Sequence, residues 1–154
     1  MSTLIDKDLV DKDLAADTVL EITRVIAAPP EQVFDAWLQK SWGEWAGPPG
    51  VKGEVLQLEP KVGGKYKMVM HRPDGGTLTV GGTYKEITRP SRLVMSWKWE
   101  HEETDTLITL SFRSKGQGTE IHMRHEGFAN ADRRDSHNNG WTGTFDRLEK
   151  FIAR

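Results

Sequence analysis

The chain of 154 residues contains no cysteine, which excludes disulfide bonds and thiolate metal sites. No apolar stretch approaches the length of about 18 residues that a membrane-spanning helix needs. The formal net charge is −2, without the basic excess that is typical of nucleic-acid-binding domains. The N-terminus also lacks the cationic start and apolar block of a secretory signal. We therefore expect a cytoplasmic protein with no nucleic-acid partner and no membrane partner.

The first 17 residues differ in composition from the rest of the chain. They contain five aspartates against two lysines, and the tetrapeptide DKDL occurs at 6–9 and again at 11–14. Their apolar residues recur every five positions, a spacing that fits neither a helix nor a strand. We predict that residues 1–17 form an acidic flexible lead, or a loosely docked short helix, before one domain over residues 18–154.

The start of this domain predicts one strand followed by two short helices. Residues 18–27, TVLEITRVIA, are rich in β-branched side chains and indicate a strand. Residues 28–39, APPEQVFDAWLQ, indicate a helix, because proline is tolerated in the first turn and Glu31 complements the helix dipole there. Residues 40–50 add a short, interrupted helix that ends at a glycine and two prolines.

From residue 51 the pattern changes to an alternation of apolar and polar residues. Six segments with this pattern follow one another between tight turns, over 51–60, 63–72, 77–87, 92–101, 105–113 and 119–128. Residues 131–153 then show helical spacing of large apolar residues. We predict an α+β fold, in which a curved antiparallel sheet of six to seven strands wraps around a long C-terminal helix. The glycine pairs 63–64 and 81–82 are expected where the strands bend.

The order of several motifs carries a resemblance to a known family. ITRVIAAPPEQVFDAW, a tryptophan-rich turn, VGGKYKM, GGTYKEITRPSRLVMSWKWE, GTEIHMRHEGF and NNGWTGTFDRL occur in this order over residues 18–153. The set resembles the START-like helix-grip superfamily (SRPBCC), and within it the group named for the activator of heat-shock-protein-90 ATPase. The resemblance implies a β-α-α-β6-α helix-grip arrangement with an apolar cavity between the sheet and the last helix. The cavity would be lined by inward residues of the middle strands and by the first turns of that helix.

Fifteen residues are the candidate ligand contacts. His137 and Trp141 lie four residues apart on one helical face, and Gly140 and Gly143 would allow a ligand or backbone to approach closely. The alternative for each aromatic or methionine is ordinary core packing. The candidates share a large ring or an adaptable thioether: Trp37, Trp42, Trp45, Tyr66, Met68, Met70, Tyr84, Met95, Trp97, Trp99, Met123, His125, His137, Trp141 and Phe145.

Two further questions stay open at the level of sequence. Trp42 and Trp45 lie on a short broken helix, where they would form a lid or a contact surface, or else close one end of the fold. His125 and His137 are the candidates for proton transfer, because an unperturbed imidazole titrates near neutral pH. The alternative for His125 is a core residue whose ring is hydrogen-bonded.

The sequence shows no motif for a metal or a cofactor, and we expect neither. HExxH, the phosphate-binding glycine loop and GxSxG are all missing, and His122 should face away from His125. Three functions remain: binding of a small hydrophobic or aromatic molecule as a carrier, sensor or sequestering protein; a cyclase, dehydratase or hydrolase reaction on such a molecule; or an interaction with a chaperone in a stress response.

Overall fold

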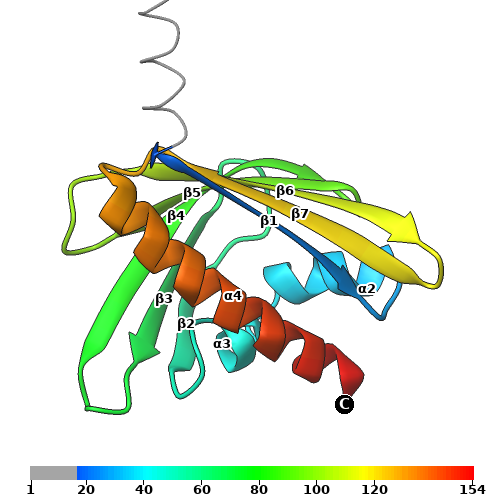
Figure 1. Cartoon of the computed structure of the whole chain (residues 1–154), viewed down its shortest axis with the longest axis horizontal. Helices are drawn as coiled ribbons and strands as arrows, with labels where there is room; N and C mark the ends of the chain where they lie inside the picture. The colour runs from blue at the N-terminus through cyan, green and yellow to red at the C-terminus, as the bar shows by residue number, and fades with distance from the viewer. Residues whose placement is uncertain (1–16) are drawn as a thin grey trace, which may run out of the picture.

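The computed structural model describes residues 17–154. The predicted acidic lead therefore lies, except for Asp17, outside the described residues. Within them, one seven-stranded antiparallel sheet has the order β1-β7-β6-β5-β4-β3-β2 (Figure 1). The strands are β1 Val19–Ile26, β2 Lys52–Leu58, β3 Lys65–His71, β4 Thr77–Thr88, β5 Arg92–Trp99, β6 Thr106–Lys115 and β7 Gly118–Glu126.

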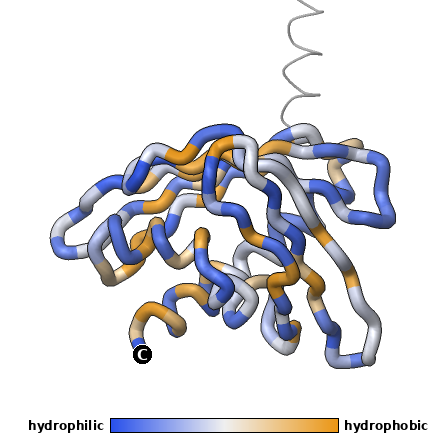
Figure 2. The backbone as a smooth tube through the Cα atoms, turned by 180° about the vertical axis from the view of Figure 1, so that it is seen from behind, coloured by the Kyte–Doolittle hydropathy of each residue, from blue (hydrophilic) through white to orange (hydrophobic). Residues whose placement is uncertain are grey.

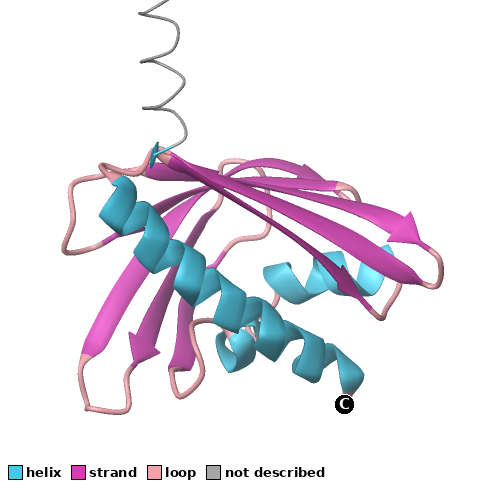
Figure 3. Ribbon diagram, viewed as in Figure 1, coloured by secondary structure: helices cyan, strands magenta, loops and turns pink. Residues whose placement is uncertain are grey.

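The helices lie together on the concave side of this sheet (Figure 3). They are α2 Pro30–Asp35, the 3-10 turn η1 Ala36–Leu38, α3 Trp42–Trp45 and the long α4 Ala131–Ala153. The short helices carry the chain from the edge strand β1 to the opposite edge strand β2. None of the helices in residues 17–154 is both long and apolar enough to cross a membrane. The predicted α+β helix-grip fold is confirmed.

Local signals explain where the main helix begins and where the sheet bends. The side chain of Asn130 accepts a hydrogen bond from the backbone N–H of Arg133 at 2.9 Å, which caps α4. In β4, a Cβ atom on Gly82 would lie 2.0 Å from the carbonyl oxygen of Ser96, so the close approach of β5 requires glycine. The register between β4 and β5 shifts just beyond, between Tyr84 and Glu86.

The core fills much of the space between the sheet and the helices. Buried residues alternate with more exposed ones along most of the strands. The backbone tube in Figure 2 shows how hydrophobic and hydrophilic residues are distributed along them. Leu93, Met95 and Trp97 of β5 are all buried, as the alternation in the sequence predicts. Phe145 and Leu148 of α4 pack onto this layer and are fully buried. A pocket is left open near the N-terminal half of α4.

Candidate functional site

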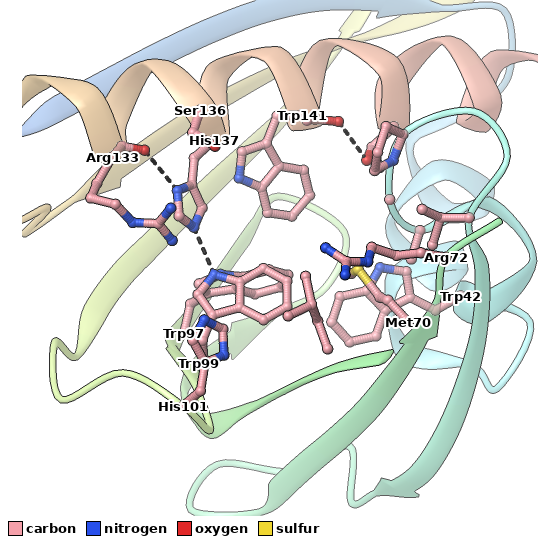
Figure 4. Close-up of a pocket in the computed structure, with 17 residues that line it drawn as sticks. Trp42, Met70, Arg72, Trp97, Trp99, His101, Arg133, Ser136, His137 and Trp141 are labelled. Atoms are coloured by element: carbon pink, nitrogen blue, oxygen red, sulfur yellow. Dashed lines mark hydrogen bonds between the residues drawn. The ribbon is translucent and has the colours of Figure 1, made fainter. Parts of the chain in front are cut away.

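A pocket of about 420 Å³ lies between α4, the strands β3 to β5 and the segment that follows α3 (Figure 4). Buried side chains form its floor, while exposed residues such as Arg72 and Ser136 form its rim. Its lining consists of Trp42, Ala46, Gly47, Pro48, Val51, Met70, Arg72, Leu78, Trp97, Trp99, His101, Arg133, Ser136, His137, Gly140, Trp141 and Thr144.

Four tryptophans from three elements form the apolar wall of this pocket. Trp97 stands at the centre, with its ring centroid 5.1 Å from Trp141 of α4, 5.5 Å from Trp99 and 6.5 Å from Trp42 of α3. Trp97 and Trp99 are two residues apart on β5, so their side chains leave the same face of the strand. This wall offers flat aromatic faces against which another ring can stack or pack edge-on.

Six of the fifteen predicted ligand contacts line the pocket: Trp42, Met70, Trp97, Trp99, His137 and Trp141. The other nine do not. They are buried in the core that supports the pocket: Trp37, Trp45, Tyr66, Met68, Tyr84, Met95, Met123, His125 and Phe145.

Trp42 and Trp45 do not form an exposed contact surface. Trp42 is 1% exposed and Trp45 is fully buried, and both pack against Trp37 with ring centroids 6.2 and 4.8 Å away. The interpretation as a contact surface is therefore wrong. The short helix α3 closes one end of the fold, because its two indoles complete the aromatic core. Only Trp42 reaches the pocket.

His125 is held in the core as a neutral ring. The hydroxyl of Thr106 donates its proton to the carbonyl oxygen of Trp97 at 2.7 Å, so the same hydroxyl accepts from Nε2 of His125, also at 2.7 Å. Nδ1 of His125 then accepts from the indole N–H of Trp141 at 3.0 Å. Burial lowers the pKa of His125 well below 6.5, and the neighbouring His137 adds to this effect. Both ring nitrogens are therefore occupied by protein partners.

His137 reaches the pocket from α4 and is also held by two partners. Its Nδ1 donates to the carbonyl oxygen of Arg133 at 2.8 Å, and its Nε2 accepts from the indole N–H of Trp99 at 2.8 Å (Figure 4). Burial lowers the pKa of His137, and this outweighs the hydrogen bond to the Arg133 carbonyl, which raises it. A protonated ring would place two N–H donors against each other at Trp99. The arrangement therefore fits a neutral imidazole that orients Trp99.

We expect the protein to lose stability as the pH falls below about 6.5, the usual histidine pKa. The unfolded chain takes up protons there, whereas His125 and His137 stay neutral in the folded chain because burial lowers their pKa. Each histidine then lowers the free energy of unfolding by up to about 1.4 kcal/mol for every pH unit below this value. Urea unfolding at a series of pH values between about 7.5 and 5 measures this slope. The variant His137→Asn should show a shallower slope, and an unfolding free energy that stays constant or rises on acidification would contradict the prediction.

Sequence reasoning missed three groups of lining residues. Ser136 and Thr144 lie four residues before and four residues after Gly140, on the side of α4 that carries His137 and Trp141. Helical spacing could therefore have identified them from the sequence. The rim residues Arg72, Leu78 and His101 and the segment 46–51 carried no such signal. Their place at the pocket depends on how the strands and the loop approach α4.

The two helix glycines have different roles at this site. A Cβ atom on Gly143 would lie 2.8 Å from Cδ of Pro49, so this glycine lets the segment after α3 pack directly on α4. A Cβ atom on Gly140 would meet no heavy atom within 4 Å. Gly140 lines the pocket and leaves space open next to Trp141.

The pocket residues do not form a metal-binding set. Among residues 17–154, no group of three or more histidines, aspartates or glutamates is placed to hold a metal ion. The chemistry that the lining offers is aromatic contact, hydrogen-bond donation and positive charge.

Comparisons with solved structures place this fold among bacterial and eukaryotic relatives. A protein from Chromobacterium violaceum is 25% identical, with a TM-score of 0.84 over 89% of this chain and 98% of that chain. A protein from Rhodobacter sphaeroides is 27% identical, with a TM-score of 0.75 over 88% of this chain and 93% of that chain. An Hsp90 activator from Plasmodium falciparum is 24% identical, with a TM-score of 0.68 over 88% of this chain and 96% of that chain, and shows the shared fold. A search of curated proteins found no match.

A family model matches nearly the whole of the described domain. It covers residues 27–153, from just after β1 to the last turn of α4, and its description is Activator of Hsp90 ATPase homolog 1-like protein. The match thus includes the strands β2 to β7, all of α4 and every residue that lines the pocket. The chain therefore belongs to the family of activator of Hsp90 ATPase homolog 1-like proteins, within the START-like SRPBCC superfamily.

Proposed function

We propose that this protein binds a small hydrophobic or aromatic molecule in the pocket between α4 and the sheet. The observation that carries the proposal is the pocket of about 420 Å³ walled by four tryptophans. This volume falls within the range of roughly 300–1,000 Å³ that is usual for small-molecule sites, which are mostly apolar with a few polar groups. The family is consistent with such a ligand-binding cavity.

The geometry favours binding without a reaction. A general base needs a ring nitrogen within hydrogen-bond reach of the substrate. Both nitrogens of His125 and both nitrogens of His137 already bond to protein groups. In this arrangement the two imidazoles support the tryptophan wall and do not face the pocket as bases. A carrier, sensor or sequestering role therefore has more support than a cyclase, dehydratase or hydrolase role.

A ring placed at Gly140 should block the pocket. We expect Gly140→Phe to weaken binding of the neutral fluorophore N-phenylnaphthylamine at least tenfold, because the new ring enters space that is open at this position. The probe fluoresces more strongly in apolar surroundings, so a fluorescence titration measures its affinity.

Two matched variants control this experiment. Gly140→Ala adds only a Cβ atom in open space and should keep the affinity while favouring the helix by up to about 1 kcal/mol. Asn139→Phe adds the same ring at the exposed neighbouring position and should also bind normally. If Gly140→Phe is folded by circular dichroism and binds the probe as well as these controls, the proposed pocket is not the binding site.

The family model supports a second candidate function, stimulation of a chaperone ATPase. This function requires a protein surface and does not depend on the pocket. Purified Hsp90 should hydrolyse ATP faster in the presence of this protein if the second candidate is correct, and Gly140→Phe should stimulate equally. An unchanged ATPase rate at saturating protein would eliminate it.

A further inference from the structure

We infer that the molecule bound in this pocket is an aromatic acid, and that its carboxylate pairs with Arg72. This inference rests on the proposed function, because it names the chemical class of the ligand for the same site. It follows from the charges at the rim, from the aromatic wall and from the partners of the two rim arginines.

The side chains that line the pocket carry positive charge and no negative charge. Arg72 and Arg133 are cationic, His101 is also part of the lining, and no aspartate or glutamate belongs to it. The acidic partners of the two arginines, Asp74 and Glu102, lie outside this lining. Among the lining groups themselves, a carboxylate would meet only attractive or neutral ones.

The two rim arginines differ in the strength of their contacts with neighbouring carboxylates. A guanidinium N–H of Arg133 donates to the carboxylate of Glu102 in a close hydrogen bond, and the Arg133 backbone carbonyl binds His137. Within residues 17–154, the guanidinium of Arg72 has only a loose ion pair with Asp74, at 3.6 Å between Nε and Oδ1, in which both side chains are largely exposed. Exposed pairs of this kind are weak.

Arg72 is also directed toward the aromatic wall. Its guanidinium extends from the end of β3 into the space between α4 and the strands, below Trp141 (Figure 4). A guanidinium offers a planar pair of N–H donors that matches a carboxylate. The aromatic body of an acid would then lie against Trp97, Trp99 and Trp141 while its carboxylate meets Arg72.

Calorimetric titration with naphthoate and its neutral analogue naphthamide tests the inference. These two probes share an aromatic body and differ in charge. We expect the wild-type protein to bind naphthoate about tenfold more tightly than naphthamide, and added salt to reduce this preference. Arg72→Gln should weaken naphthoate binding about tenfold and leave naphthamide binding unchanged, which removes the preference. Arg92→Gln removes the same charge from an exposed ion pair with Glu86 that is not part of the pocket, and it should behave as wild type.

The outcomes separate the two proposals. Equal affinity of the wild-type protein for both probes, or a preference that survives Arg72→Gln, would overturn the aromatic-acid inference while the binding function stands. If neither probe binds, and N-phenylnaphthylamine does not bind either, both the inference and the proposed function fail. Circular dichroism of each variant establishes that a lost preference does not come from unfolding.

Discussion

Replacement of Trp37 by alanine is expected to lower the free energy of unfolding by about 3–5 kcal/mol. Trp37 is 1% exposed and lies at the centre of the aromatic core. Its ring centroid is 4.8 Å from Trp45, 6.0 Å from Trp141, 6.0 Å from Phe145 and 6.2 Å from Trp42. Alanine would leave a cavity between α3, α4 and the core. Because domains are typically stable by only about 5–15 kcal/mol, this loss would be a large part of the total.

Urea unfolding followed by circular dichroism measures the effect, and phenylalanine provides the control. The indole N–H of Trp37 has no hydrogen-bond partner among the protein atoms described, so Trp37→Phe should lose packing but no hydrogen bond. Trp141→Phe should lower the free energy of unfolding by about 1–3 kcal/mol more than Trp37→Phe does, because it leaves Nδ1 of the buried His125 without its donor. A Trp37→Ala variant within about 1 kcal/mol of the wild type would show that the core does not depend on this ring.

Removal of the Arg147 side chain should be the next most damaging change, lowering the free energy of unfolding by about 3 kcal/mol. Its guanidinium donates to the backbone carbonyls of Glu44 at 2.8 Å, Ala46 at 2.7 Å, Gly47 at 3.0 Å and Pro48 at 3.2 Å. Hydrogen bonds from a charged donor are stronger than neutral ones. Burial lowers the pKa of Arg147, because removal from water disfavours the charged form. Arg147 thus ties α4 to the chain segment that forms one wall of the pocket.

Arg147→Ala should therefore also weaken N-phenylnaphthylamine binding several-fold, because the wall segment 46–51 is no longer held against α4. Arg147→Lys should recover only part of the loss, since an ammonium group cannot reach four carbonyls with a planar fork. Arg154→Ala is the matched control at the C-cap of the same helix. It removes an ion pair with Glu44 in which both side chains are exposed, and it should change stability by less than about 1 kcal/mol. Equal unfolding midpoints for Arg147→Ala and Arg154→Ala would contradict the prediction.

Local sequence signals determined the elements of this fold. Apolar and polar residues alternate through β3, β5, β6 and β7, and the large residues of 131–153 recur with helical spacing, so the type and approximate bounds of each element could be predicted. The sequence predicts strand bends at two pairs of glycines. The pair 81–82 lies just before the register shift between Tyr84 and Glu86, and Gly82 also lets β5 approach closely. The pair 63–64 lies in the connection between β2 and β3 and not within a strand. His137 and Trp141 could be assigned to one face of α4 because residues four apart share a face.

The tertiary structure alone decided which inward residues line the pocket and which fill the core. Trp97 and Met95 follow the same alternation on β5, yet only Trp97 meets the pocket, whereas Met95 is buried in the core. Arg72 of the sheet reaches the rim of a pocket that α4 also lines. Arg147 donates to the carbonyl of Ala46, about a hundred positions away in the sequence. Periodicity describes the direction of a side chain from its own strand or helix. It carries no information about what the opposite layer places against that side chain, and this contact determines whether a ring packs solidly or borders open space.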